Sequence, residues 1–545
     1  MSDAREQSEG KTKAPPRRAG APDETRASTL DLSDAALREL GAQTLALVTE
    51  YFARVGELDI FPDGTAGEIA RSINAEVLPP AEAVPLEKII DDCKVIFSKS
   101  RNNGSPRFFG YVASPAAPVG AFASLLAAAL NQNVTAWRSA PAATEIEKTV
   151  VRWLATLVGY GEACGGLLTS GGSMANLNAL FVAHRTQFKN DTASSKGLWG
   201  AGAPATLYVS DQVHLSVPKA ADVLGVGREQ VRVVATDEGF RMDVRALREM
   251  LAGDAGRGLR PFCVVASAGT VGTGAVDPLT EVARVAAEHR LWFHIDGAYG
   301  ALARLDPKRR ALFDGLELAD SLSLDPHKWL YAPVDCGCLL LRDPPQARAA
   351  FRATEESYIK VYEEDDAESF AFWDYGVELS RPFRALKVWM MLRYYGARRV
   401  AGAIAEDNTL AAYLAERVEA ADDFELLAPV TLGVCCFRYV PPDIARALEA
   451  AGGDDEERAR LIAHLDELNT RVMRAVQRGG RAYLSNASLR GRCALRASIT
   501  NFRTTRRDID ATLGIIRAAA GEEMKRVKAE GWKDETGRGD TGVRS

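Results

Sequence analysis

Cysteine is scarce in this sequence, with eight residues among 545. The cysteines form no pair of C-x-x-C clusters of the kind that a structural zinc site requires, so no metal site is expected. Several lie in apolar runs, as Cys263 does in Pro-Phe-Cys-Val-Val. This placement is typical of buried free thiols in a reducing compartment. Cys336 and Cys338 could form a reactive pair, although alternation along a strand explains their spacing better.

Long apolar runs and an excess of basic charge are also missing. No stretch of about 18 uninterrupted apolar residues occurs, so a membrane span is not expected. The first residues, Met-Ser-Asp-Ala-Arg-Glu, lack the apolar core of a signal peptide, which favours a cytoplasmic protein. The formal net charge is -6, which gives no basic footprint for nucleic acid.

Composition changes along the chain and divides it into segments. Residues 1–28 and 521–545 have few large apolar side chains, so both are predicted to be disordered tails. Between them the sequence is typical of a globular protein of two or three packed units. We expect an N-terminal helical segment over 29–115, a large domain over 116–410 and a small domain over 411–520.

Secondary structure in the large domain is predicted to alternate between strands and helices. Helix-period apolar residues occupy 118–134 and 142–158, and a helix follows a glycine-rich turn at 177–187. Strands that are apolar on both faces and alternate with helices favour a parallel sheet covered on both sides. The strands are expected at 205–210, 231–235, 262–267, 291–295 and 337–341. After a long helix at 382–418, strand-like residues 424–440 and 482–500 indicate a smaller α+β domain.

A lysine follows an apolar run in Asp320-Ser-Leu-Ser-Leu-Asp-Pro-His-Lys-Trp. The run stops at a proline, so Lys328 is expected at the end of a strand, beside Trp329 and near His327. A lysine amine in apolar surroundings loses its charge more easily, because desolvation disfavours the charged form. A neutral amine is what Schiff-base formation with a carbonyl cofactor requires. The alternative is an ordinary lysine whose amine reaches water at the strand end.

Asp296 closes the apolar segment Trp292-Phe-His-Ile-Asp-Gly-Ala-Tyr-Gly, where a lone carboxylate would be costly. A protonated pyridine nitrogen would stabilise this carboxylate, which would in turn keep the ring an electron sink. Ala298 is small enough for a flat ring to pack on it. The alternative is an aspartate that only caps the following turn. Because Lys328 ends a later strand, the two residues together favour the cofactor interpretation.

A glycine-rich segment, Gly165-Gly-Leu-Leu-Thr-Ser-Gly-Gly-Ser-Met-Ala-Asn, predicts a strand, a turn and a helix. Backbone amides at such a helix start form phosphate sites, and Gly172 and Ser173 are placed to be the donors. The segment is not a Walker loop, and it lacks the G-x-G-x-x-G spacing. Glycine-rich helix starts often serve only as turns, so this motif alone leaves phosphate binding open.

His214 follows the strand predicted at 205–210, in Ser-Asp-Gln-Val-His-Leu-Ser. Ligands of open α/β sheets bind at the carboxyl edge of the strands, where this imidazole is expected. A lone histidine is more often structural. Here, however, an amine, a carboxylate, a phosphate turn and a flat imidazole converge on one edge of one sheet. Pyridoxal phosphate needs all four groups, and we predict it as the cofactor.

The order of these motifs resembles the group II pyridoxal-phosphate decarboxylases, with the greatest likeness to the aromatic-L-amino-acid decarboxylase branch. Matching stretches run from about Phe108 to Gly396 and include Ala-Trp-Arg-Ser-Ala-Pro-Ala-Ala-Thr-Glu-Ile-Glu at 136–147 and Arg-Pro-Phe-Arg-Ala-Leu-Lys-Val-Trp at 381–389. The resemblance implies the fold-type I, aspartate-aminotransferase-like architecture. This is a mostly parallel seven-stranded sheet with flanking helices and a small C-terminal α+β domain. It also implies an intertwined homodimer with active sites at the interface.

Cofactor roles follow from the resemblance position by position. Lys328 is implied to form the Schiff base, Asp296 to pair with the pyridine nitrogen and Ala298 to pack on the ring. His214 is implied to stack on the other ring face, near the substrate carboxylate. The remaining cofactor-binding positions are Gly172, Ser173, Ser267, Asp325 and His327.

Substrate roles are implied in the same way. Tyr111 and Ser114 match substrate-pocket positions. Tyr358, in Ser-Tyr-Ile-Lys, matches the loop tyrosine that protonates the carbanion after decarboxylation, and relatives that make aldehydes tend to carry phenylalanine there. Thr135 stands where the animal enzymes have an aromatic residue that reaches in from the partner subunit.

The reaction implied is decarboxylation of an L-amino acid to an amine and carbon dioxide through a quinonoid, with an aromatic amino acid favoured. Because Thr135 is a departure, an acidic or diamino acid stays open as the substrate. An aldehyde synthase or an aminotransferase on the same scaffold is a further alternative. A non-catalytic paralogue is disfavoured, because Lys328, Asp296, His214 and Tyr358 are all present.

Overall fold

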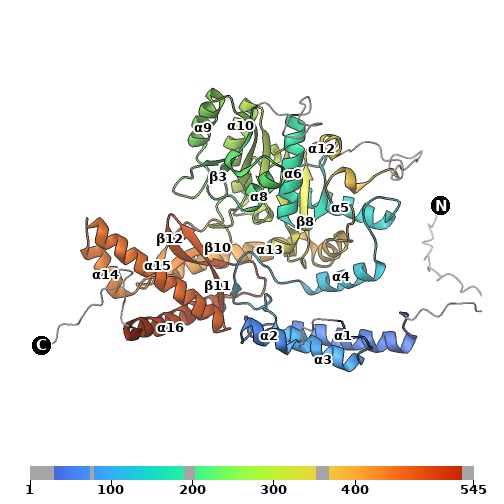
Figure 1. Cartoon of the computed structure of the whole chain (residues 1–545), viewed down its shortest axis with the longest axis horizontal. Helices are drawn as coiled ribbons and strands as arrows, with labels where there is room; N and C mark the ends of the chain where they lie inside the picture. The colour runs from blue at the N-terminus through green and yellow to red at the C-terminus, as the bar shows by residue number, and fades with distance from the viewer. Residues whose placement is uncertain (1–29, 74–78, 189–202, 352–367, 531–545) are drawn as a thin grey trace, which may run out of the picture.

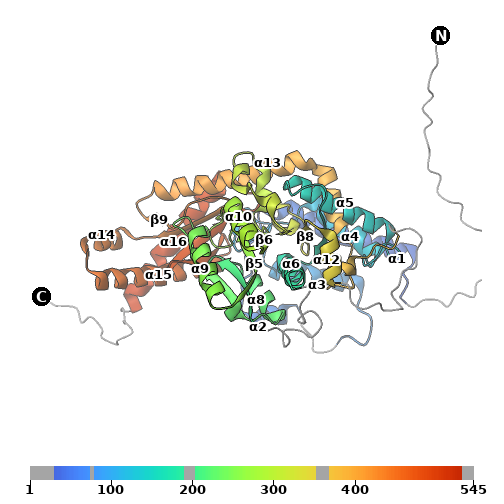
Figure 2. The same ribbon diagram turned by 90° about the horizontal axis from the view of Figure 1, so that it is seen from above.

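The structure is a computed structural model that describes residues 30–73, 79–188, 203–351 and 368–530 (Figure 1). Helices α1 (Asp34–Arg54), α2 (Ala66–Ser72) and α3 (Leu86–Lys99) form a layer along one side of the molecule. The large sheet domain and the C-terminal domain lie beyond this layer (Figures 1 and 2). Among the described residues, no helix is long and apolar enough to cross a membrane.

A seven-stranded sheet forms the centre of the large domain, in the order β2-β8-β7-β6-β5-β3-β4. Every neighbouring pair is parallel except the two that β8 makes, with β2 and β7. This confirms the predicted mostly parallel seven-stranded sheet. The strands are β2 (Gly165–Thr169), β3 (Ala205–Ser210), β4 (Val231–Val234), β5 (Arg260–Ser267), β6 (Trp292–Asp296), β7 (Ser321–Leu324) and β8 (Gly337–Leu341).

Helices cover this sheet so completely that every residue of β6, β7 and β8 is buried. Burial of successive residues means that both faces of the strands are covered, which is why these segments are apolar without alternation. Helix α6 packs against β5, β6, β7 and β8, while α9 and α10 pack against β5. The helices of this domain are α4 (Pro118–Leu130), α5 (Pro141–Leu157), α6 (Gly172–Gln187), α8 (Ser216–Val223), α9 (Val244–Gly256), α10 (Leu279–His289), α11 (Pro326–Trp329) and α12 (Pro344–Phe351).

The register of the parallel strands aligns their carboxyl ends. Ser267 of β5 lies opposite Asp296 of β6, and Asp296 lies opposite Ser323 of β7. The turns that follow these strands therefore start from one edge of the sheet. This edge is where ligands of open α/β sheets bind.

A five-stranded sheet in the order β1-β11-β12-β10-β9 forms the C-terminal domain. Strand β1 (Phe108–Phe109) pairs in parallel with β11, so the predicted N-terminal segment contributes a strand to this sheet. The other strands are β9 (Phe424–Leu426), β10 (Val434–Tyr439), β11 (Tyr483–Leu489) and β12 (Arg492–Ser498). Its helices are α14 (Pro442–Ala450), α15 (Asp455–Arg478) and α16 (Arg506–Glu530).

Two predicted boundaries differ from the structure. The boundary between 410 and 411 falls inside α13 (Ala385–Glu419), whose helical geometry breaks instead at Gly396, with φ 74°. The tail predicted from 521 is wrong for its first part, because α16 continues to Glu530. Met524 packs on the core of the C-terminal domain, and i,i+3 ion pairs such as Glu522–Lys525 support the exposed face of the helix. The low apolar content of residues 521–530 concealed the last part of this helix.

Asp407 of α13 joins the large domain to the C-terminal domain. Its Oδ2 accepts hydrogen bonds from Trp329 Nε1 at 2.8 Å and from the Tyr331 hydroxyl at 2.7 Å, and the backbone of Asn501 also bonds to this carboxylate. Tyr299 stacks on Trp329 with ring centroids 4.8 Å apart. Burial raises the pKa of Asp407 to about 7, although the donors from Tyr331 and Trp329 oppose the shift.

This raised pKa predicts a pH-dependent contribution to stability. The folded state holds a proton on Asp407 up to about pH 7, whereas the unfolded state releases it near pH 4. The free energy of unfolding therefore falls as pH rises between these values, by at most on the order of 4 kcal/mol. Asp407→Asn cannot ionise, so its melting temperature relative to wild type should rise from pH 5 to pH 8. The exposed Asp422→Asn is the control, and a pH-independent difference for Asp407→Asn would contradict the assignment.

Candidate active site

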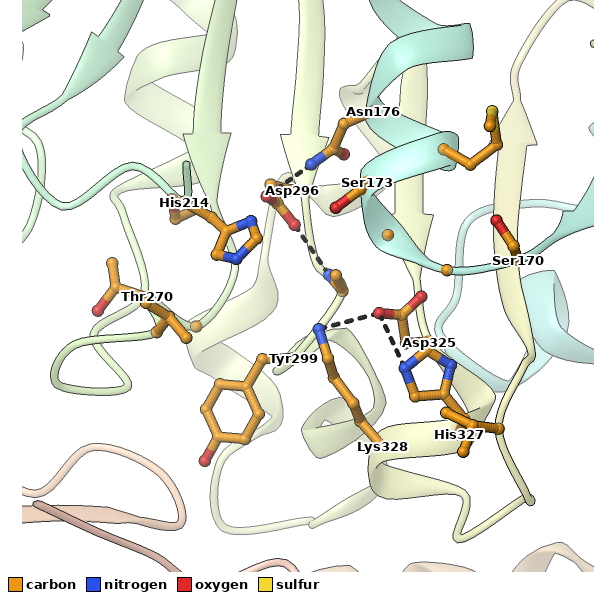
Figure 3. Close-up of a pocket in the computed structure, with 18 of the residues that line it drawn as sticks. Ser170, Ser173, Asn176, His214, Thr270, Asp296, Tyr299, Asp325, His327 and Lys328 are labelled. Carbon is orange, nitrogen blue, oxygen red and sulfur yellow. Dashed lines mark hydrogen bonds and ion pairs between the residues drawn. The ribbon is translucent and has the colours of Figure 1, made fainter. Parts of the chain in front are cut away.

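A cavity of about 350 Å³ opens at the carboxyl edge of the large sheet. Its walls include the four residues on which the cofactor prediction depends most, Lys328, Asp296, Ala298 and His214 (Figure 3). The other predicted cofactor positions, Gly172, Ser173, Ser267, Asp325 and His327, line the same cavity. The structure thus brings together every residue proposed from sequence for the cofactor. A volume of this size lies within the range of small-molecule sites.

Lys328 lies in the short helix α11, just after β7, and not at the strand end itself. Its Nζ is 2.9 Å from Asp325 Oδ2, so the amine faces a carboxylate and is not in purely apolar surroundings as expected. His327 Nε2 lies 3.6 Å from the same oxygen, and His327 Nδ1 donates to the Cys336 carbonyl at 2.7 Å. Burial lowers the pKa of His327, against the effect of the Asp325 charge. Asp325 thus orients the Lys328 amine at the cavity wall, with the His327 ring beside it.

Asp296 is 8% exposed and accepts three hydrogen bonds within the chain. Asn176 Nδ2 donates to Oδ2 at 2.9 Å, while the Ala298 backbone N–H and the Ser323 hydroxyl donate to Oδ1 at 3.1 and 3.3 Å. The sequence required a partner for this carboxylate but did not identify Asn176. A signal existed, because residues 172 and 176 share one face of a helix at i,i+4 spacing.

His214 lies in the turn after β3, and Figure 3 shows its ring beside Asp296. Its Nδ1 is 2.8 Å from the Ser216 hydroxyl oxygen. Burial lowers the pKa of His214, while the nearby charge of Asp296 opposes this shift. A neutral imidazole at ordinary pH follows, with its flat ring on the cavity wall.

Gly172 begins α6 directly behind Ala298 and Asp325. A Cβ at this position would lie 2.7 Å from the Ala298 Cβ and 3.0 Å from Asp325 Oδ2, so only glycine fits. The first backbone N–H groups of a helix have no acceptor within the helix. Those of Gly172 and Ser173 stand at the start of α6 on the cavity wall, where an anion can accept from them.

The predicted substrate residues lie apart from this cavity. Tyr111 is 51% exposed, and its hydroxyl lies 3.2 Å from that of Tyr483. Thr135 is buried, and its carbonyl accepts from the Phe372 backbone N–H at 2.8 Å. The hydroxyl of Ser114 is buried. Among the residues that the structure describes, the lining of the cavity does not include Tyr111, Ser114 or Thr135. Tyr358 lies outside the described residues, so its role stays a prediction.

Arg496 of β12 is a charged residue that the sequence did not single out. It is 4% exposed and donates to the carbonyls of Tyr111 at 2.7 Å and Gly272 at 3.1 Å. Among the described residues, no carboxylate forms an ion pair with Arg496, and its Nη2 has no hydrogen-bond acceptor. Burial lowers the pKa of this guanidinium. Arg496 thus places a buried positive charge beside the loop at 269–272, and residues 269–271 of this loop line the cavity.

Comparison with known proteins agrees with this geometry. The pyridoxal-dependent decarboxylase conserved domain matches residues 69–440. An aromatic-L-amino-acid decarboxylase of Bacillus atrophaeus is 35% identical over 497 residues, which covers 90% of this chain and 97% of that protein. A phenylacetaldehyde synthase of a Rosa hybrid cultivar is 29% identical over 475 residues, covering 85% and 90%.

A solved structure extends the likeness to three dimensions. The crystal structure of Oryza sativa TDC with PLP and tryptamine superposes with a TM-score of 0.81 at 27% identity, and the match covers 91% of this chain and all of that one. The predicted fold-type I architecture is thereby confirmed. The domain match, the relatives and the cavity agree, and the chain belongs to the family of pyridoxal-phosphate-dependent decarboxylases.

Proposed function

We propose that this enzyme decarboxylates an aromatic L-amino acid to its amine and carbon dioxide. The observation that carries the proposal is the convergence of Lys328, Asp296 and His214 on one cavity, beside the N-terminus of α6. The buried positive charge of Arg496 near this cavity supports a substrate that bears a carboxylate. The aromatic substrates named for the relatives support the aromatic class.

The residues of the cavity fit pyridoxal phosphate. Lys328 would hold the aldehyde of the cofactor covalently, and Asp325, 2.9 Å from its amine, would orient it. The backbone N–H groups of Gly172 and Ser173 would hold the phosphate, with His327 at the same end of the cavity. The crowded position of Gly172 supports this assignment, because a side chain there would collide with Ala298 and Asp325 at the start of α6.

The ring of the cofactor would lie between Ala298 and His214. Asp296 would accept a hydrogen bond from the pyridine nitrogen, with Ser267 opposite it on the neighbouring strand. When bound, pyridoxal phosphate withdraws electrons from the α-carbon of the substrate, which lets the carboxylate leave as carbon dioxide. The hydrogen bonds that Asp296 accepts from Asn176 and from the Ala298 backbone N–H orient its carboxylate for this contact.

Two side chains would act on the substrate itself. His214, kept neutral by burial, would pack over the ring and exclude water from the departing carboxylate. Tyr358 would donate a proton to the α-carbon after carbon dioxide leaves, which yields the amine. Tyr111, Ser114 and Thr135 would contact the substrate side chain from the proposed interface between subunits.

An aldehyde product is the second candidate, because the similar proteins include a phenylacetaldehyde synthase. Tyr358 favours the amine, since a positioned acid at the α-carbon competes with oxidation there. An acidic or diamino substrate is a further possibility, and Thr135 is the residue that keeps it open.

We also propose that the enzyme is a homodimer. Helices α1, α2 and α3 bury no residue within the chain, although α1 exposes Leu37 (58%) and Leu45 (49%). Helices that stay folded without burying apolar side chains need a partner surface. A second copy of the chain would supply it.

Lys328→Ala tests the covalent assignment. The wild-type holoenzyme should absorb in the visible, and borohydride reduction should leave the cofactor on the peptide that contains Lys328. The variant should lose both signals and amine formation, because no other amine occupies this position. Lys308→Ala, on the surface, is the control and should behave as wild type. Cofactor trapped on a different lysine in the variant would exclude the assignment.

Tyr358→Phe tests the reaction outcome across a panel of aromatic, acidic and diamino acids. The variant should still bind pyridoxal phosphate, while amine formation falls about 10²- to 10⁴-fold, the usual loss for a general acid. Peroxide and aldehyde should be scored in parallel, because the aldehyde route consumes oxygen. Tyr394→Phe, at an exposed site, is the matched control. Undiminished amine output would remove Tyr358 from the mechanism, and a preference for acidic or diamino acids would overturn the aromatic substrate.

Leu37→Asp combined with Leu45→Asp tests the homodimer by sedimentation. Two charges on the apolar face of α1 should shift the enzyme toward monomers and lower its activity. Leu312→Asp, which alters an exposed leucine far along the chain, should leave the dimer intact. A monomeric but active wild-type enzyme would rule out the homodimer.

A further inference from the structure

A buried network of hydrogen bonds extends from Asp296 into the protein, and its member Asn176 also lines the cavity. It contains Trp292 and His294 of β6, Ser321 of β7 and Asn176 of α6, none more than 4% exposed. The predicted chemistry uses none of these four side chains. Buried polar groups are costly unless each donor meets an acceptor, so the direction of every bond in the network is constrained.

The direction starts at Trp292, whose indole Nε1 can only donate. Its N–H is 2.8 Å from the Ser321 hydroxyl oxygen, so this oxygen accepts, and its own proton is available to His294 Nδ1 at 2.8 Å. Burial lowers the pKa of His294 to about 4, against the opposing charge of Asp296. The imidazole is therefore neutral. Its Nδ1 also lies 3.1 Å from the Ser321 carbonyl oxygen, which can only accept, so the proton is assigned to Nε2 from the Asn176 side of the ring, where Asp296 requires Nδ2 and Oδ1 is left to accept.

His294 Nε2 then donates to Asn176 Oδ1 at 3.0 Å. This bond fixes which end of the Asn176 amide faces the cavity. With Oδ1 occupied, Nδ2 points to Asp296 Oδ2 at 2.9 Å, where Figure 3 shows the bond. The reverse orientation would set the amide oxygen against a carboxylate oxygen, and no donor would remain between them.

Asn176 Nδ2 has a second proton, which it donates to the Ser216 hydroxyl oxygen at 2.9 Å. The Ser216 hydroxyl is then left to donate to His214 Nδ1 at 2.8 Å, and the Ser216 backbone N–H approaches the same nitrogen at 3.3 Å. His214 consequently carries its own proton on Nε2. One amide group thus controls both the carboxylate and the imidazole of the site.

We propose that Asn176, held in one orientation by His294, is the positioning residue that keeps Asp296 an oriented acceptor and His214 an Nε2–H donor. The proposal rests on the roles proposed above for Asp296 and His214. It differs from a packing role, because a packing role depends on the shape of His294 and not on its Nε2 proton.

The pair His294→Gln and His294→Met separates these roles. Glutamine carries an N–H near the place of Nε2, whereas methionine has similar size and no donor. The measurement is the dissociation constant of pyridoxal phosphate from the apoenzyme, with the apoenzyme melting temperature beside it. His294→Met should bind the cofactor about 10- to 100-fold more weakly, the usual effect of losing a hydrogen bond to a charged group. His294→Gln should stay within about threefold of wild type.

Ser216→Ala tests the branch to His214. It removes one acceptor of Asn176 Nδ2 but leaves the bond from Asn176 to Asp296 and the bond from His294 to Asn176 in place. It should leave the dissociation constant of the cofactor within about threefold of wild type. It should lower kcat and shift the pH profile of kcat, because His214 Nδ1 loses its hydroxyl donor. An unchanged kcat and pH profile would overturn the branch to His214.

Three outcomes complete the design. Equal cofactor affinity for His294→Met and His294→Gln in folded protein would overturn the branch to Asp296. If His294→Met fails to fold, Asn176→Leu replaces it, because leucine has a similar size and no donor to Asp296, and wild-type cofactor affinity there would overturn the branch to Asp296 as well. Asp296→Asn is the reference: if it binds cofactor and turns over as wild type does, the proposed function fails and not only the role of Asn176.

Discussion

The buried carboxylate of Asp296 is the constraint on which the rest of the site depends. It ends a central strand whose every residue is buried, and only 8% of Asp296 itself is exposed, so few water molecules can solvate it. An isolated charge in such a place would be neutralised or expelled. The chain meets this cost with donors from three elements, which are the β6 turn, β7 and α6. The position of α6 over the sheet is thereby tied to the charge, and with it the glycine turn that begins the helix.

An ion pair lies at the other end of the cavity. Asp325 follows the neighbouring strand β7 and would be as costly as Asp296 if it were alone. Its partner is the amine of Lys328, three residues later. His327 Nε2 lies 3.6 Å from the same oxygen, Asp325 Oδ2. The two acidic residues thus face different tasks, since one is held by neutral donors and the other by a cation. Asp296, held by neutral donors, has no cationic partner among the described residues and can accept from a cationic ligand, whereas Asp325 orients the Lys328 amine.

The sequence was sufficient for the sheet and for the groups at its edge, because both depend on local patterns. The strands at 205–210 and 337–341 carry continuous apolar runs, and the residues after several strands are polar, so their common edge could be inferred. Asn176 was missed because its one signal was its i,i+4 spacing from Gly172, and its importance appears only when α6 lies on β6. The helical residues 521–530 were missed because charged residues outnumber the apolar Met524, Val527 and Ala529 in this stretch.

Among the described residues, the predicted substrate positions Tyr111, Ser114 and Thr135 do not line the cofactor cavity of their own chain. Tyr111 and Thr135 belong to segments that pair or pack away from the cofactor cavity, and α1 to α3 bury nothing within the chain. In the proposed homodimer these segments would meet the cavity of the second subunit. Cofactor chemistry would then depend on one rigid sheet edge, and substrate choice on an interface. The interface residues can change without disturbing Asp296 or Lys328, because no hydrogen bond among the described residues connects Thr135 with either of them. One scaffold could in this way serve relatives that act on different amino acids and form different products.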